Sequence, residues 1–357
     1  MATISLCMIV KDEESVLDRC LASIADLMDE IIIVDTGSTD RTKEIAARYT
    51  DQIYDFVWVD DFSAARNFAF SKATGDYIYT ADADEVLDAE NHRRFAFLKY
   101  SMVPEIDIVQ MKYITPDEYN TVMNIRNEYR PKLYRRLRQF RWVDPVHETV
   151  QLQPLVFDSD VEILHLPQSQ HSGRDFALFL RMFQNGQPLS DKLHTMYARE
   201  LFISGSDQDF VKAEPVFAQT LREVREPTVR LKEAVCVMCR CMRVQGSLPA
   251  FFKYALRSMA YYPCAEICCE LGIYFKQMKD YEEAARWFLC AAQETESILD
   301  VHKSGDFPLL QLAECYDCLT QDNPAMREEY QRMEQEYRAK ALEWEMPEEI
   351  PRFPVTV

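Results

Sequence analysis

The sequence predicts an α/β domain built on a mixed, mainly parallel sheet, followed by an all-helical repeat domain. Three observations carry this prediction. Up to about residue 168, short apolar runs alternate with amphipathic stretches, a pattern typical of a parallel sheet covered by helices. From about His171 the strand pattern is lost. Prolines then recur at intervals of 39, 36 and 45 residues, near the period of stacked helix pairs: Pro188, Pro227, Pro263 and Pro308. We therefore expect one domain over residues 1–170 and a second over residues 171–357.

The first domain is expected to begin with four strands separated by three helices. The strand candidates are residues 4–10, 30–35, 52–57 and 76–81, and the helix candidates are residues 13–27, 40–49 and 61–73. Asp40 and Asp61 stand where they can accept hydrogen bonds from the free amides of a first helical turn. Open sheets of this kind bind ligands beyond the carboxyl ends of their strands. The loops at Lys11, Asp35 and Asp82 are therefore expected to face one crevice.

The clearest helix pair of the second domain lies within residues 263–293. Small residues such as Ala265, Gly272 and Ala284 stand where two helices would pack closely, and this unit resembles a tetratricopeptide repeat. The other units match less well, and Pro215 falls inside an expected helix, which it would shorten or kink. Helical repeats most often bind peptides or partner proteins, and a cap over the first domain is the alternative.

Composition disfavours several classes of function. The 357 residues include 40 Lys and Arg against 59 Asp and Glu, a formal net charge of -19, which disfavours binding to nucleic acid or anionic membranes. No signal-peptide pattern and no apolar run of about 18 residues is present, so we expect no membrane span and a cytoplasmic location. The 11 cysteines are then expected to be reduced thiols. Two groups have zinc-like spacing but lie in expected helices, so core thiols are favoured: Cys236, Cys239 and Cys241, and Cys315 with Cys318.

Paired carboxylates follow the fourth expected strand, in the run Asp-Ala-Asp-Glu at residues 82–85. Mg²⁺ and Mn²⁺ prefer oxygen ligands, and Mg²⁺ is commonly held by one or two carboxylates together with substrate phosphates. Asp82 and Asp84 are therefore expected to hold Mn²⁺ or Mg²⁺ against a diphosphate. A solvated acidic loop is the alternative, because a chain this rich in acidic residues forms such runs by chance.

Several segments together resemble one known family. They are residues 5–14 (SLCMIVKDEE), 34–40 (VDTGSTD), 62–67 (FSAARN), 75–76 (GD), 82–85 (DADE) and 146–148 (VHE). In order and spacing they resemble family 2 glycosyltransferases of the GT-A fold, over roughly residues 1–170. One branch of that family carries tetratricopeptide repeats after the transferase, and some of its members glycosylate bacteriocin peptides on cysteine. The resemblance implies an inverting enzyme that moves a sugar from a nucleotide sugar, a UDP-sugar by preference, to a peptide, protein or glycan acceptor.

The resemblance also implies roles for individual residues in a nucleotide site. Asp35 would accept a hydrogen bond from the N3–H of a pyrimidine, and Arg66 would lie near the nucleotide. Asp82 would face the ribose and the metal, and Asp84 would bind the metal directly. Lys11, at the end of the first strand, is assigned to the same nucleotide site.

The base that activates the acceptor is expected downstream of the acidic run. Glu148 is favoured because it lies in the matched Val-His-Glu segment, Asp144 is the second candidate, and an exposed loop is the alternative for both. His147 and His165 are candidates for additional metal ligands, with a packed or surface histidine as the alternative. A basic cluster between Arg126 and Arg141 would in part grip the diphosphate, and the rest of it would be solvated.

Two classes of function remain open at this point. In the first, the chain is a metal-dependent glycosyltransferase whose repeats present the acceptor. In the second, it is a non-catalytic scaffold whose repeats bind a partner while the sheet domain has lost turnover. Asp35, Arg66, Asp82, Asp84 and Glu148 together favour the enzyme. An apolar end of the repeat domain would favour a homodimer.

Overall fold

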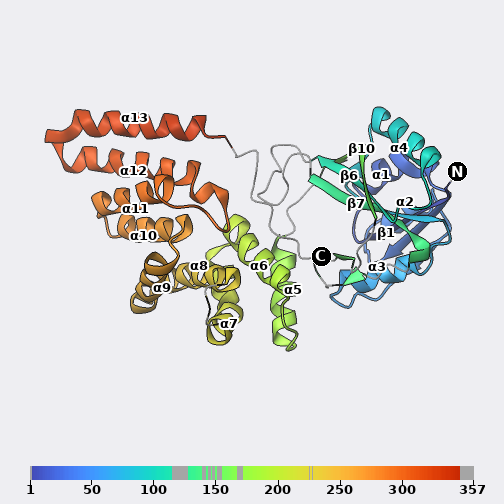
Figure 1. Ribbon diagram of the computed structural model, residues 1–357, viewed down its shortest axis with the longest axis horizontal. Helices are drawn as coiled ribbons and strands as arrows, with labels where there is room; N and C mark the ends of the chain where they lie inside the picture. The colour runs from blue at the N-terminus through green and yellow to red at the C-terminus, as the bar shows by residue number, and fades with distance from the viewer. Residues whose placement is uncertain are drawn as a thin grey trace. The chain divides into compact units, whose positions relative to one another are not determined.

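The structure is a computed structural model, and it describes residues 2–114, 128–138, 142–143, 146, 149–150, 155–166, 172–224, 226 and 228–345. The chain separates into two compact units, residues 1–171 and residues 172–354, and each is described by itself (Figure 1). The predicted domain boundary falls among residues 167–171, outside the described ranges, and it stays a prediction.

The first unit contains a mixed sheet of eight strands in the order β3-β2-β1-β4-β7-β6-β10-β5. The strands β3, β2, β1 and β4 are mutually parallel, β7 runs antiparallel to both β4 and β6, and β10 is parallel to β6 and antiparallel to β5. Their bounds are β1 (Ile4–Val10), β2 (Glu30–Asp35), β3 (Ile53–Asp55), β4 (Tyr77–Thr80), β5 (Glu85–Val86), β6 (Ile108–Ile114), β7 (Glu128–Arg135) and β10 (Val156–His165). A small second sheet pairs β8 (Trp142–Val143) with β9 (Thr149–Val150). The four predicted strands are confirmed, each with its position in the parallel part of the sheet.

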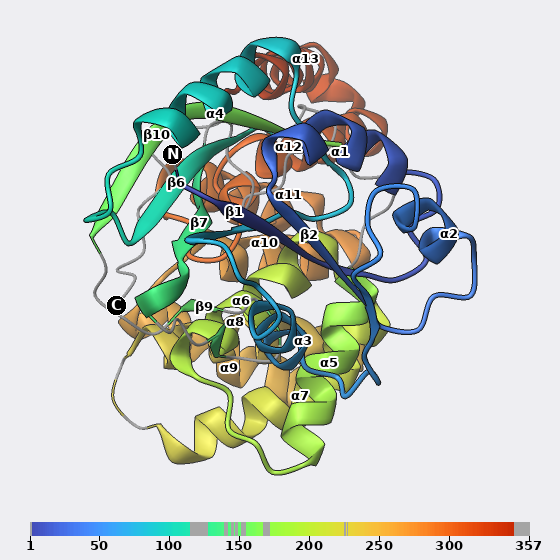
Figure 2. The same ribbon diagram turned by 90° about the vertical axis from the view of Figure 1, so that its right-hand side faces the viewer.

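Helices cover both faces of this sheet. They are α1 (Leu17–Ile24), α2 (Thr42–Ala46), α3 (Phe62–Phe70) and α4 (Ala89–Ser101), with short 3₁₀ turns at Ala25–Leu27 and Arg136–Arg138. Successive residues of a strand point to opposite faces. Leu6 and Met8 of β1 accordingly pack in the core with α1 and α4, whereas Cys7 packs in a second core with α3. Figure 2 shows α1 and α4 above the sheet and α3 below it.

Local sequence explains where these helices begin. Asp61 is the N-cap of α3, and its side chain accepts a hydrogen bond from the backbone amide of Ala64 at 3.1 Å. Asp40 accepts a hydrogen bond from the amide of Thr42 at 2.9 Å, at the start of α2. Both predicted capping interactions are therefore present. Gly75 lets β4 start close to β1, because a Cβ at this position would lie 2.9 Å from the backbone nitrogen of Ser5.

The second unit is a series of helices in which sequence neighbours pack against each other. Their bounds are α5 (Ser172–Gln184), α6 (Asp191–Ser204), α7 (Asp207–Glu223), α8 (Val229–Val244), α9 (Leu248–Tyr261), α10 (Ala265–Gln277), α11 (Tyr281–Gln293), α12 (Asp306–Asp322) and α13 (Arg327–Glu343), with 3₁₀ turns at Val301–Lys303 and Pro324–Met326. The predicted α/β fold class with a helical second part is thereby confirmed.

Two positions of the second unit test specific expectations. Gly272 of α10 approaches α11 so closely that a Cβ would lie 2.8 Å from the Phe288 ring, which confirms that a small residue brings these helices together. Pro215 lies inside α7, which is 17 residues long in total and extends beyond the proline to Glu223, so the predicted shortening of the helix is wrong. Among the described residues, no helix combines the length and apolar character that crossing a bilayer requires.

Candidate active site

The first three predicted site loops leave the sheet at one edge. Val10 of β1 pairs with Asp35 of β2, and Cys7 of β1 pairs with Thr80 of β4. Because these strands are parallel, their carboxyl ends coincide, and the residues that follow them are gathered at the same edge. Lys11 is exposed directly after β1, so the structure brings it to this edge as predicted.

Asp35 is buried at the end of β2 with one oxygen occupied and the other without a partner. Its Oδ1 accepts hydrogen bonds from the amides of Gly37 at 2.9 Å and Ser38 at 3.0 Å, and Lys43 Nζ lies 3.8 Å away. Gly37 has φ 106°, a conformation that glycine adopts without strain and that turns the chain over the carboxylate. The second oxygen, Oδ2, is buried and has no hydrogen-bond partner in the described part of the chain. A buried acceptor without a donor is costly, and the described residues supply no donor to this atom.

The loop after β1 is tied to the loop after β2. Asp12 has φ 55°, its amide donates to Ser38 Oγ at 2.9 Å, and its Oδ1 accepts from the amide of Thr39 at 2.7 Å. These two hydrogen bonds cross from one loop to the other. They fix the loop that carries Lys11 relative to the loop that follows Asp35.

Arg66 and Asp82 meet across the site. Arg66 Nη2, on α3, lies 3.3 Å from Asp82 Oδ1, and its guanidinium carbon lies 5.0 Å from the centre of the Trp142 ring. Desolvation acts to raise the pKa of Asp82, but the positive charges of Arg66, Lys132 and Arg130 outweigh it and lower the pKa to about 2. Asp82 is therefore ionised throughout the physiological pH range, and Arg66 is held in place from two sides.

The side chain of Asp84 contacts a histidine, whereas that of Asp82 contacts Arg66. His165 Nε2, at the end of β10, lies 3.1 Å from Asp84 Oδ2, and the two side chains are 16% and 17% exposed. The antiparallel pairing of β10 with β5, which places His165 opposite Glu85, produces this contact. The His165 ring also packs against Tyr113, with the ring centres 5.0 Å apart. Of the two predicted histidine ligands, His165 is therefore brought to the acidic run.

The donor set at this position suits a divalent cation. Asp84 offers carboxylate oxygens and His165 a ring nitrogen, a combination that Mn²⁺ accepts more readily than Mg²⁺, which keeps to oxygen ligands. Asp84 and His165, which contact each other, could hold an ion directly. Asp82 contacts Arg66 beside them.

The strand β7 supplies two further cations to the site. Lys132 forms a buried ion pair with Glu85, whose second oxygen, Oε2, is buried without a hydrogen-bond partner among the described residues. Burial raises the pKa of Glu85, although Lys132 opposes the shift. The guanidinium carbon of Arg130 lies 3.8 Å from the centre of the Tyr113 ring. Alternate residues of β7 therefore carry positive charge toward the acidic run.

The rest of the predicted basic cluster serves the fold or lies outside the description. Arg135 pairs with Asp107 at 3.8 Å, and Arg136 donates to the carbonyl of Gly75 at 2.6 Å, both away from the acidic run. Of these four cations, Arg130 and Lys132 of β7 lie at the site, whereas Arg135, at the end of β7, and Arg136, in the 3₁₀ turn after it, brace the sheet. Arg126 and Arg141, at its two ends, lie outside the described residues.

Three of the predicted catalytic and metal-binding residues are not described by the structure. Asp144, His147 and Glu148 all fall in gaps of the described ranges, and their roles stay predictions. Trp142, in contrast, is described and buried beside Arg66. Sequence analysis did not assign it to the site, and the signal that could have found it is the aromatic residue next to the basic cluster.

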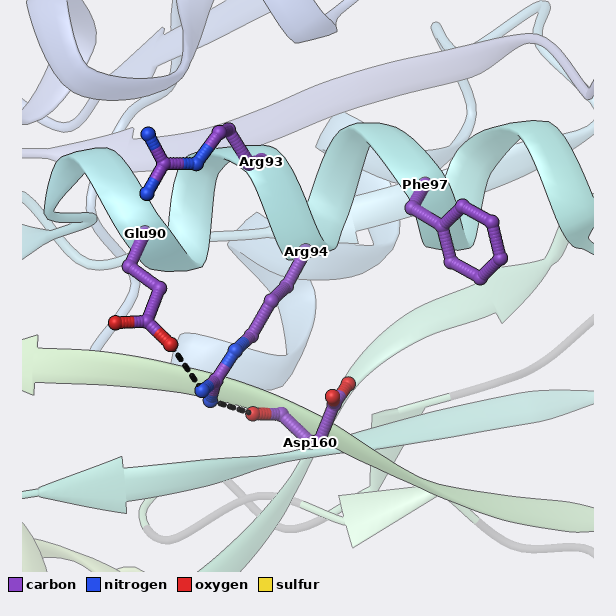
Figure 3. A pocket seen from close by; sticks show the side chains of 5 residues that line it. All are labelled: Glu90, Arg93, Arg94, Phe97 and Asp160. Carbon is purple, nitrogen blue, oxygen red and sulfur yellow. Dashed lines mark hydrogen bonds and ion pairs between the residues drawn. The ribbon is translucent and has the colours of Figure 1, made fainter.

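A separate pocket lies between α4 and β10 and contains none of the predicted site residues (Figure 3). Arg94 crosses it, forming an ion pair with Glu90 and donating to the Asp160 carbonyl at 3.0 Å. The Phe97 ring stands at one end of the same helix face (Figure 3). Because Arg94 is already engaged on both sides, this pocket does not present it to an anionic ligand.

The fold and the site together define a class of protein: an α/β domain that places carboxylates and cations at the carboxyl edge of its parallel strands, as nucleotide-binding enzymes do. Comparison with known proteins then gives the family. Residues 5–168 match the family described as Glycosyl transferase family 2, so the first unit is a family 2 glycosyltransferase domain, as the sequence predicts.

Curated relatives match parts of the chain. A TPR repeat-containing protein of Synechococcus elongatus is 56% identical over 90 residues, which cover 25% of this chain and 22% of the relative. The prophage-derived glycosyltransferase SunS of Bacillus subtilis is 28% identical over 222 residues, covering 60% of this chain and 46% of SunS. An uncharacterized glycosyltransferase of Rickettsia typhi is 34% identical over 90 residues, covering 25% and 30%. The chain spans less than half the length of these relatives.

Solved structures align more loosely. TarS of S. aureus, residues 1–349, aligns with a TM-score of 0.39 and 12% identity over 82% of this chain and 92% of TarS. Glucosyl-3-phosphoglycerate synthase of Mycobacterium tuberculosis, solved with Mn²⁺ and UDP-glucose, aligns with a TM-score of 0.28 and 21% identity over 31% of this chain and 44% of that chain. Alignments with scores this low carry no argument about the site, so its interpretation depends on the contacts within this protein.

Proposed function

We propose that this chain is a metal-dependent, inverting glycosyltransferase that moves a sugar from a UDP-sugar to a peptide, protein or glycan acceptor. The observation that carries the proposal is the buried Oδ2 of Asp35, which has no hydrogen-bond partner among the described residues and lies at the same sheet edge as Asp82 and Asp84. A uracil ring presents an N3–H group, which would donate a hydrogen bond to Asp35 Oδ2. A cytosine ring has an acceptor at N3 and would meet the carboxylate with like polarity.

The remaining residues fit the two phosphates of such a donor. Asp84 and His165 would hold Mn²⁺ or Mg²⁺, which when bound neutralises the charge of the departing diphosphate. Arg66 is fixed between Asp82 and Trp142, so its fork of donors is oriented before a ligand arrives. Arg130 and Lys132 add positive charge on the same side. A preorganised field of this kind stabilises charge that develops as the sugar leaves.

The acceptor side of the reaction rests on the predicted base. Glu148 would remove the acceptor proton, with Asp144 as the second candidate, and the helical repeats would present the peptide, protein or glycan. Inversion of the configuration at the anomeric carbon is inferred from the resemblance to the family. The identity of the sugar is set by contacts beyond those described.

A binding experiment with one substitution tests the proposal. UDP affinity is measured by calorimetry with and without Mn²⁺, for the unmodified protein and for Asp84→Ala. We expect Mn²⁺ to strengthen UDP binding in the unmodified protein and to have no effect in Asp84→Ala, because that variant lacks a carboxylate ligand. Asp51→Ala is the control, since Asp51 is an exposed residue that belongs to none of the predicted sites.

Turnover is measured in the same samples by release of nucleoside diphosphate across common UDP- and GDP-sugars. Hydrolysis of one UDP-sugar in the presence of Mn²⁺, lost in Asp84→Ala, supports the enzyme. If neither Mn²⁺ nor the Asp84→Ala substitution changes the affinity for UDP, the assigned metal site is ruled out. Metal-dependent binding without any turnover, with acceptor peptides included, would favour the scaffold.

A further inference from the structure

Two cysteines and a glutamate come together in the interior of the helical unit, far from the site described above in sequence. Cys236 lies in α8, Cys264 directly precedes α10, and Glu266 lies in the first turn of α10. One ligand atom from each of the three residues lies within 4.8 Å of the others, and the two Sγ atoms are 3.5 Å apart. All three residues are at most 2% exposed.

Glu266 is held in one orientation with an oxygen to spare. Its Oε1 accepts hydrogen bonds from three consecutive amides, Ile298 at 2.9 Å, Leu299 at 2.6 Å and Asp300 at 3.1 Å. Its Oε2 is buried and has no hydrogen-bond partner within the described ranges. A carboxylate oxygen in this situation is costly unless a cation or a proton occupies it.

The spacing of the cluster matches zinc better than a disulfide. Zn–S bonds of about 2.3 Å at a tetrahedral angle separate two sulfur atoms by about 3.8 Å, whereas a disulfide requires about 2.05 Å. The observed separation of 3.5 Å excludes a disulfide and is compatible with two thiolates on one zinc ion; two hydrogen-bonded thiols have the same separation, so the third residue, Glu266, is what distinguishes the cluster. Ser258 Oγ lies 4.0 Å from Cys264 Sγ and donates a hydrogen bond to the Tyr262 carbonyl at 3.1 Å; a fourth ligand would be this hydroxyl or a water.

Charge supports the same assignment. Two thiolates and one carboxylate around Zn²⁺ leave one negative charge in the interior. Arg199, which is 7% exposed, interacts electrostatically with Glu233 and, to a smaller extent, with Glu266, so it would offset part of that charge.

We propose that Cys236, Cys264 and Glu266 bind a structural Zn²⁺. Each thiol loses its proton to solvent as its Zn–S bond forms, and no electron transfer is involved. The ion would fasten α8 to the start of α10 and, through the Oε1 contacts of Glu266, to residues 298–300. The pairing joins cysteines from different helices, so the C-x-x-C spacing of Cys236 with Cys239 has no part in it.

The test uses the full chain, purified with reductant and without chelator, and Co²⁺ as the probe. A cobalt ion bound by thiolate gives a sulfur-to-metal charge-transfer band in the near ultraviolet, whereas cobalt at Asp84 and His165 cannot. We expect this band, displaced by Zn²⁺, with about one zinc retained per chain after dialysis. We expect Cys236→Ser and Cys264→Ser to lose the band, and Cys239→Ser, a buried cysteine of the same helix, to keep it.

Glu266→Gln keeps an acceptor for the three amides and removes the charge. Loss of even an outer-sphere partner weakens metal binding on the order of tenfold, so this variant should bind Zn²⁺ at least about tenfold more weakly. Circular dichroism establishes that each variant is folded. The proposal is overturned if the folded, unmodified protein shows no charge-transfer band. It is also overturned if Cys239→Ser loses the band as fully as Cys236→Ser, or if thiol counting shows that Cys236 and Cys264 are joined as a disulfide under reductant.

Discussion

Asp35 Oδ2, for which the described part of the chain offers no hydrogen-bond donor, allows a prediction about which base the protein binds. In Asp35→Asn the side chain keeps one oxygen, which can still accept from the amides of Gly37 and Ser38. The other position then carries an NH₂ donor instead of an acceptor. Uracil N3–H would face a donor, whereas cytosine N3, an acceptor, would face a partner. The substitution should therefore weaken UDP and favour CDP.

The size of the effect follows from the geometry. A hydrogen bond to a charged group contributes about 1.5 to 3 kcal/mol, and each 1.4 kcal/mol is about tenfold in affinity. UDP binding should fall by roughly 10- to 100-fold, and the ratio of UDP to CDP affinity should fall by at least as much. Folding stability should change little, because Oδ2 has no hydrogen bond to lose within the described residues.

The assay is calorimetry of UDP and CDP, with Mn²⁺ present, against the unmodified protein and Asp35→Asn, with urea denaturation of both proteins. Asp51→Asn is the control, because Asp51 is exposed and belongs to none of the predicted sites. An unchanged ratio of UDP to CDP affinity in Asp35→Asn would refute the assignment of Asp35 to the base. Equal loss of both nucleotides would indicate that Asp35 supports the loop only.

Two further predictions concern the charges around the acidic run. Lys132→Met leaves Glu85 buried without its cation, and should lower the free energy of unfolding, measured by urea denaturation, by about 3 to 5 kcal/mol. The double variant that also carries Glu85→Gln should recover most of this loss. If the effects of the two substitutions add instead, the pairing is contradicted. Because the pKa of Asp82 is lowered from 3.8 to about 2, its contribution to stability should be complete above pH 4 and lost as pH falls from 4 to 2. The measurement is stability against pH for the unmodified protein and Arg66→Met, in which this acid-dependent loss should be smaller, because the folded pKa of Asp82 rises toward its unfolded value; identical profiles would contradict the contact.

The sequence was most informative where one strand alone determines a position. The β1, β2 and β4 segments are nearly continuous apolar runs, which is how buried parallel strands read, and their ends place Asp35 and Asp82 at one edge. Asp61 as a cap depends only on the three residues that follow it. Predictions of this kind need no knowledge of the rest of the fold.

The contacts that sequence analysis left open all depend on pairing between distant segments. Nothing near His165 in sequence distinguishes it from His147 as a metal ligand. His165 meets Asp84 because β10 returns across the sheet and pairs antiparallel with β5, in a register that a shift of one residue would reverse. Cys236 and Cys264 show the same limit in helices, since the C-x-x-C spacing relates Cys236 to Cys239, whereas helix packing brings Cys236 against Cys264 at the start of another helix. Ligands that come from different helices or strands are therefore expected to be missed when a site is sought from motif spacing, because such spacing relates only residues within one element.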